Sequence, residues 1–173
     1  MPTFNAIPQY TKTPTYRVNI FWDYLKNALE DYNSGGVLQL DPPFQRAHVW
    51  THLQQVAYVE YILRGGAGAR DIFFNQADFM RGFKAPMYLV DGKQRVESVR
   101  CFMRDNLRVF DRYFYSDFTD RLPLHADFVF LVNDLPTYAD VLQWYIDLNA
   151  GGVAHTTEEI DRVRKLLERE CMK

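Results

Sequence analysis

One stretch of the chain, residues 87–103, constrains the fold more than any other. Its first four residues are apolar and predict a short buried strand, and Asp91-Gly92 then predicts a tight turn. From residue 96 onward, apolar side chains recur at helical spacing. A helix that follows a strand so closely leaves several backbone N–H groups unpaired in its first turn. Those donors, the helix dipole, Lys93 and Arg95 favour an anion such as phosphate, and the alternative is a solvated turn with surface charges.

Length, charge and cysteine content limit the class of protein. The 173 residues carry 20 basic and 22 acidic side chains, a net charge of −2, so any contact with DNA must come from a local patch. Two cysteines, Cys101 and Cys171, make no disulfide framework. Neither a signal peptide nor a run of about 20 apolar residues is visible. We therefore expect a cytoplasmic protein that makes no membrane contact.

Hydrophobic periodicity predicts short strands mixed with helices. Three prolines predict an extended arm over residues 1–18, and the pattern predicts a single domain over 19–173. Strands are expected at 37–40, 71–75, 87–90 and 126–132, with one or two more within 107–118, where two strands would make a hairpin. Helices are expected after the capping residues Asn19, Thr51, Thr137 and Thr156, as well as after Gly92. This mixture indicates an α+β (mixed α/β) fold with a small sheet surrounded by helices.

Three junctions between these elements combine glycine or proline with polar side chains. They are Pro43-Phe-Gln-Arg46, Asp91-Gly-Lys-Gln-Arg95 and Asn149-Ala-Gly-Gly152. Binding and catalytic groups concentrate at such junctions because a rigid scaffold holds them there. Each of the three segments is therefore a candidate binding or catalytic segment.

The chemistry of the second junction follows from its residue types. Gly92 lets a phosphate approach the backbone, Arg95 offers a bidentate fork, and Lys93 adds a point charge. Asp91 is suited to hold Mg²⁺ or to orient a water, and Gln94 to position a nucleophilic water.

In this order and spacing, the three junctions resemble the ParB-like (sulfiredoxin-fold) domain family that carries an Asp-Gly-Gln-Gln-Arg motif. Asp91-Gly-Lys-Gln-Arg95 stands in the place of that motif. Residues 43–50 are similar to the family's Pro-x-Gln-Arg-x-x-x-Trp element, and residues 148–152 to its Asn-x-Gly-Gly segment before a capped helix. The likeness covers about residues 37–168. The family includes the nucleotide-hydrolysing parts of modification-dependent restriction enzymes and of phosphorothioate-sensing defence proteins.

The resemblance implies a ParB/sulfiredoxin-like sheet and a nucleoside triphosphatase (hydrolase) site that uses a nucleoside triphosphate with Mg²⁺. The residues implied to be catalytic are Asp91, Gln94 and Arg95, and those implied to bind nucleotide are Gln45, Arg46, Gly92, Lys93, Asn149, Gly151 and Gly152. Lys93 departs from the family, which has glutamine there, and leaves open whether the nucleotide is hydrolysed or only held. No HNH-type nuclease domain follows, so we expect DNA cutting to require a separate nuclease or defence protein.

Other patterns are weaker indications. His48 and His52 are spaced like a helical metal pair but lack a third ligand, and Cys101 lacks a histidine partner, so we expect no zinc, haem or flavin and no catalytic thiol. A basic ridge for DNA is one interpretation of a set of cations, and a solvated face is the other. That set is Arg81, Lys84, Arg100, Arg104, Arg108 and Arg112. The amphipathic helix over 158–170 suits either core packing or an oligomer contact.

Three functions are thus compatible with the sequence. The first is a ParB-like domain that binds and hydrolyses nucleoside triphosphates in a DNA-directed setting such as restriction, defence or phage biology. The second is a non-catalytic module that uses nucleotide as a switch to bind DNA or a partner protein. The third is a stand-alone nuclease, which the absence of an evident metal cluster disfavours.

Overall fold

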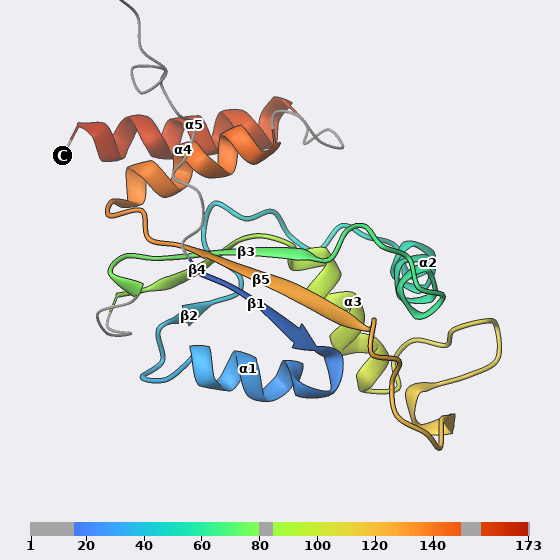
Figure 1. Cartoon of the computed structure of the whole chain (residues 1–173). Coiled ribbons are helices and arrows are strands. Elements are labelled where there is room, and N and C mark those ends of the chain that lie inside the picture. The colour runs from blue at the N-terminus through green and yellow to red at the C-terminus, as the bar shows by residue number, and fades with distance from the viewer. Residues whose placement is uncertain (1–15, 80–84, 150–156, 173) are drawn as a thin grey trace, which may run out of the picture.

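The computed structural model describes residues 16–79, 85–149 and 157–172, and its centre is a five-stranded mixed sheet (Figure 1). The strands, in chain order, are β1 (Tyr16–Phe21), β2 (Leu38–Gln39), β3 (Asp71–Gln76), β4 (Met87–Asp91) and β5 (Asp127–Asn133). They lie in the order β1-β5-β3-β4-β2. The β1–β5 and β3–β4 pairs are antiparallel, whereas β3–β5 and β2–β4 are parallel. The mixed α/β class expected from the sequence is confirmed.

Helices cover both faces of the sheet. They are α1 (Leu25–Tyr32), α2 (His52–Leu63), α3 (Lys93–Met103), α4 (Tyr138–Asn149) and α5 (Thr157–Cys171), with short 3₁₀ turns at Trp22–Tyr24 and Tyr115–Asp117. In Figure 1, α4 and α5 run side by side above the sheet, while α1 and α3 lie below it and α2 lies at one end. The domain therefore has three layers, and β4 leads directly into α3 on the lower side.

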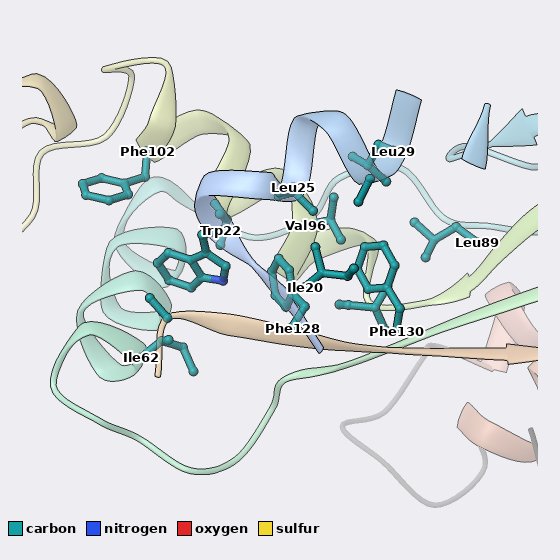
Figure 2. Packing of buried hydrophobic residues seen from close by; sticks show 14 of the residues in the cluster. Ile20, Trp22, Leu25, Leu29, Ile62, Leu89, Val96, Phe102, Phe128 and Phe130 are labelled. Atoms are coloured by element: carbon teal, nitrogen blue, oxygen red, sulfur yellow. The ribbon is translucent and has the colours of Figure 1, made fainter. Parts of the chain in front are cut away.

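Each face of the sheet has its own hydrophobic core. The larger core joins α1, α2 and α3 to the sheet, and Figure 2 shows Trp22, Leu25 and Val96 packed around Phe128 and Phe130. The smaller core joins α4 and α5 to the other face; its buried residues are Phe44, Val90, Leu135, Val141, Leu142, Trp144, Tyr145, Ile146 and Val163. Strand β4 contributes to both cores, because Leu89 belongs to the first and Val90 to the second.

Most elements lie where the sequence predicts them. The strands at 37–40, 71–75, 87–90 and 126–132 are confirmed, with small shifts of their ends. Thr51 forms the predicted capping box with Gln54, and the Thr137 hydroxyl accepts a bond of 3.1 Å from the backbone N–H of Asp140. Thr156 and the arm over residues 1–15 lie outside the described residues.

One prediction of secondary structure is wrong, and another holds only in small part. Asn19 does not cap a helix: it lies in β1, where its amide donates 2.6 Å to Asp127 Oδ2, and residues 16, 18 and 20 alternate inward as a strand requires. Residues 107–118 form no extended strands, but Val109 and Tyr113 form one isolated antiparallel bridge and exchange both of their backbone hydrogen bonds. Phe110 (φ 55°) and Asp111 (φ 54°) make the tight turn of this short hairpin, because consecutive positive φ angles are typical of hairpin turns.

Candidate functional site at the start of α3

The turn between β4 and α3 depends on Gly92. This glycine is the N-cap of α3 and has φ 104°, a conformation that L side chains rarely adopt. A Cβ atom at this position would lie 2.5 Å from Ile72 Cδ1 on β3. No side chain caps the helix, and the backbone N–H groups of Lys93, Gln94 and Arg95 have no partner among the described residues. The start of α3 therefore presents unpaired donors, as the sequence predicts.

The Pro43–Arg46 junction lies directly against this turn. Gln45 Nε2 donates to the backbone oxygens of Leu89 (2.9 Å) and Val90 (2.7 Å), which lie near the end of β4. A central strand seldom has free carbonyls, and here the parallel neighbour β2 is only two residues long. The side-chain amide of Gln45 thus supplies the hydrogen bonds that a longer neighbouring strand would otherwise donate to these two carbonyls.

Gln94 holds the next part of the same loop. Its Oε1 accepts from the backbone N–H groups of Val49 and Trp50, both at 3.1 Å, and its Nε2 donates to the oxygen of Ala47 at 3.3 Å. The residue is only 8% exposed. Sequence reasoning expected Gln94 to orient a water, but the structure engages its amide with three backbone groups of the loop.

Lys93 also turns toward this loop. Its Nζ pairs with Asp41 and donates to the backbone oxygen of Arg46 at 2.8 Å. Asp41 is 73% exposed, whereas Lys93 is 16% exposed, so the ammonium lies beneath the loop and the carboxylate lies in solvent. Lys93, like Gln94, connects α3 to the Pro43–Trp50 segment.

Asp91 and Arg95 form the outer part of the junction. The Arg95 guanidinium pairs with the Asp91 carboxylate, and their side chains are 19% and 40% exposed. Arg95 also acts on α2: burial raises the pKa of Tyr58, while the positive charges of Arg95 and Arg70 oppose that rise. The site therefore holds an accessible carboxylate and a guanidinium beside the unpaired donors of α3.

The third junction is described only in part. Asn149 ends α4 and donates from Nδ2 to the oxygen of Tyr145 at 2.7 Å, whereas Gly151 and Gly152 lie outside the described residues. The ring of Tyr145 lies 5.1 Å from that of Phe44, which brings the last turns of α4 to the Pro43–Arg46 junction.

Arg162 of α5 is a contact that sequence reasoning missed. Its guanidinium donates to the backbone oxygens of Gln45 (2.9 Å) and Phe44 (3.4 Å). In the sequence it is one of several charges on the polar face of an amphipathic helix, and no signal separates it from Arg164.

The proposed DNA ridge is not continuous. Helix α3 ends at Met103, so Arg108 does not follow Arg100 and Arg104 along one helical face, and that prediction is wrong. Arg100 pairs with Glu97 at 3.2 Å, and Arg108 lies over the ring of Phe114. Arg112 lies over the ring of Tyr113. Arg81 and Lys84 lie outside the described residues.

Metal and thiol chemistry find little support in the described part of the chain. Within it, no group of three or more His, Cys, Asp or Glu side chains is arranged to hold a metal ion. The ring Nε2 of His48 lies 2.6 Å from Gln55 Nε2, so that nitrogen accepts a hydrogen bond. Burial and the neighbouring Glu97 raise the pKa of the Cys101 thiol, which lowers its thiolate fraction at neutral pH. No helix in the described ranges has the length and apolar content to cross a bilayer.

The structure therefore brings Pro43–Arg46 and Asp91–Arg95 together and places Asn149 on the helix beside them. Chemically, this arrangement offers backbone N–H donors, a guanidinium and a carboxylate at one end of the sheet. Such groups suit a phosphate-bearing ligand. Comparisons of the chain with protein-family models, with curated proteins and with solved structures give no match.

Proposed function

We propose that this chain is a ParB-like domain that binds and hydrolyses nucleoside triphosphates with Mg²⁺ in a DNA-directed setting. One observation carries the proposal: α3 begins without a side-chain cap, and three N–H donors lie next to Arg95. Donors and dipole at a helix start together favour a phosphate group. The identity of the ligand as a nucleoside triphosphate, and the DNA-directed setting, are inferred from the resemblance of the three junctions to the ParB-like family.

Arg95 is the side chain expected to distinguish a triphosphate from a smaller anion. Its present partner, Asp91, lies one helical turn away and is 40% exposed, so a multiply charged phosphate competes with an ion pair that water already weakens. A guanidinium that leaves Asp91 would bind two phosphate oxygens at once. Asp91 would then be available as an oxygen ligand for Mg²⁺.

A second candidate is a module that holds nucleotide without hydrolysing it. The engagement of Gln94 with Val49, Trp50 and Ala47 favours this candidate, because its amide oxygen already accepts two hydrogen bonds and has no lone pair left for the proton of an attacking water. Lys93 is likewise bonded to the loop. Nucleotide binding would then change the position of the Pro43–Trp50 segment. That change would alter the binding of DNA or of a partner protein that contacts the segment.

Binding and phosphate release from ATP, GTP, CTP and UTP with Mg²⁺ separate these candidates. We expect the wild-type chain to bind at least one triphosphate, and Arg95→Ala to lose that binding. Arg164→Ala, on α5, is the matched control and should bind as the wild type does, since among the described residues Arg164 pairs with Asp161, far from the start of α3. Turnover supports hydrolysis; tight binding without turnover supports the switch; no binding to any of the four contradicts both.

Asp91→Asn tests the chemical role of the carboxylate. If Asp91 handles metal or water, this variant should lose far more turnover than nucleotide affinity. Equal losses of both would instead assign Asp91 to the turn alone. The amide keeps the size of the side chain, so the turn at Gly92 is retained.

A further inference from the structure

A cavity lies away from the start of α3, beside the long segment that joins α3 to β5. It has a volume of about 330 Å³, and its walls include Leu63, Phe102, Phe110, Tyr115 and Phe118. In Figure 2, Phe102 lies at one end of the core cluster, on the opposite side of the view from Leu89. The cavity shares no residue with the Asp91–Arg95 site. Its size falls in the range of small-molecule sites, and its apolar lining is typical of them.

Aromatic rings meet at steep angles in this cavity. Phe102 is fully buried, and its ring meets that of Tyr115 at 78° with centroids 5.5 Å apart. The ring of Phe118 meets Phe102 at 71° and 6.4 Å. Rings at such steep angles to one another can surround a space on several sides. A further aromatic ring can then bind there by edge-to-face contact.

The backbone of one wall is held in a conformation that a bulky residue seldom adopts. Phe110 has φ 55°, and its N–H donates to Glu60 Oε1 at 2.5 Å. The guanidinium of Arg64, the residue that caps the end of α2, lies 5.0 Å from the centroid of the Phe110 ring. Strain of this kind costs on the order of 1–3 kcal/mol and tends to persist at functional sites. Two contacts from the end of α2 therefore fix this aromatic wall.

Two opposite charges stand beside the aromatic walls. Asp120 and Arg121 both line the cavity and are exposed, and neither makes a hydrogen bond or ion pair with another described residue. Elsewhere along this segment, arginines do find partners: Arg108 lies over Phe114 and Arg112 over Tyr113. An adjacent carboxylate and guanidinium complement a ligand that carries an ammonium and a carboxylate on one carbon.

We propose that this cavity binds a free α-amino acid with an aromatic side chain. The side chain lies among Phe110, Tyr115 and Phe118, whose rings cover the buried Phe102, the α-ammonium group donates to the Asp120 carboxylate, and the α-carboxylate accepts from the Arg121 guanidinium. Apolar burial supplies most of the affinity, and the two charges select a zwitterion over a simple aromatic. This site is independent of the nucleotide proposal.

Calorimetric titration of the full chain tests the inference with three ligands of one shape. L-phenylalanine carries both charges, phenethylamine lacks the carboxylate, and 3-phenylpropionate lacks the amine. We expect L-phenylalanine to bind and each analogue to bind roughly tenfold or more weakly, because each loses one charge-assisted contact. Equal binding of all three, or no heat from any of them at millimolar concentration, would overturn the proposal.

Two surface substitutions assign the contacts. Asp120→Asn should weaken the binding of L-phenylalanine and phenethylamine but leave that of 3-phenylpropionate unchanged. Arg121→Gln should weaken the binding of L-phenylalanine and 3-phenylpropionate but leave that of phenethylamine unchanged. Arg169→Gln, on α5 across the sheet, is the control and should bind all three ligands as the wild type does. Because Asp120 and Arg121 are exposed and without partners among the described residues, these variants should fold. If either substitution weakens the three ligands equally, whatever charges they carry, the result would contradict the assignment.

Discussion

The first turn of α3 has an inner and an outer side, and their polar residues serve different purposes. On the inner side, Lys93 and Gln94 are largely buried and bond to the Pro43–Trp50 segment. On the outer side, Asp91 and Arg95 bond to one another next to solvent. Lys93, Gln94 and Arg95 lie in the first turn of α3, where successive residues point roughly 100° apart, and Asp91 is the last residue of β4, so these polar side chains can divide in this way.

The inner residues thus stabilise the site, whereas the outer residues are able to bind a ligand. Removing an inner contact leaves backbone groups of another segment without partners, which lowers the stability of the fold. Removal of an outer contact breaks an ion pair that water already screens, which changes ligand affinity much more than stability. The residue types alone do not reveal this difference, since all four side chains are polar and lie in one short motif.

Gly92→Ala should disturb the inner and the outer contacts together and have the largest effect on stability. The new Cβ would meet Ile72 at 2.5 Å and would also occupy a left-handed backbone position. Overpacking and backbone strain together should lower the free energy of unfolding by about 2–5 kcal/mol, as measured by urea denaturation. Gly65→Ala is the matched control, because its φ is 89° with nothing within 4 Å of the new atom, and it should show only the strain. Similar losses in both variants would mean that the Ile72 contact is unimportant.

Gln94→Leu breaks the inner side alone. The leucine has nearly the same size, but the N–H groups of Val49 and Trp50 lose their acceptor. We expect a loss of about 1–3 kcal/mol in the free energy of unfolding. Gln143→Leu, on the exposed face of α4, should change it by less than about 0.5 kcal/mol. Equal effects of the two substitutions would show that Gln94 does not hold the loop.

Arg95→Gln tests the outer side and should sharpen the contrast. Its effect on stability should stay below about 1 kcal/mol, because the lost ion pair is partly exposed. Nucleotide affinity, measured by calorimetry, should fall roughly tenfold or more, since a charge-assisted contact to phosphate is lost. A large loss of stability with unchanged affinity would place Arg95 with the inner group instead.

Lys93→Gln, which introduces the glutamine of the family motif, should have the smallest effect. The lost partner, Asp41, is 73% exposed, so we expect a loss of about 0.5–1 kcal/mol in thermal or urea unfolding. Asp41→Asn should lose less, because it keeps the bond from Lys93 Nζ to the backbone oxygen of Arg46, and the double variant should lose little more than Lys93→Gln alone. Fully additive losses would show that the two side chains do not act as a pair.

Periodicity predicts much of this fold because strands β3, β4 and β5 are short apolar runs bounded by turn residues. It fails at β1, where the alternation of Tyr16, Val18 and Ile20 competes with a helical spacing that begins at Ile20. It holds only in small part at residues 107–118, whose aromatic rings pack around a cavity and on the core without pairing into a ladder.

The candidate site could be predicted in its location but not in its internal bonds. The junctions at residues 43–46 and 91–95 meet as expected, because glycine, proline and polar residues mark where a strand or loop ends. The direction of each polar side chain depends on tertiary contacts, which a one-dimensional pattern does not contain. Arg162 shows this limit, since only the docking of α5 brings its guanidinium to Gln45.

The Pro43–Trp50 segment also has a consequence for folding. Phe44 is buried in the core beneath α4 and α5, whereas Trp50 packs with Tyr58 on the core of the opposite face. One short loop thus ties two cores together across the end of β4, and its bonds span about 45 residues of sequence. Contacts between residues so distant in sequence form late in folding. Backbone N–H groups that such contacts hold exchange their hydrogens slowly with solvent. The backbone amides of Val49 and Trp50, which donate to Gln94 of α3, should therefore exchange with solvent more slowly than the amides of the exposed residues beside them.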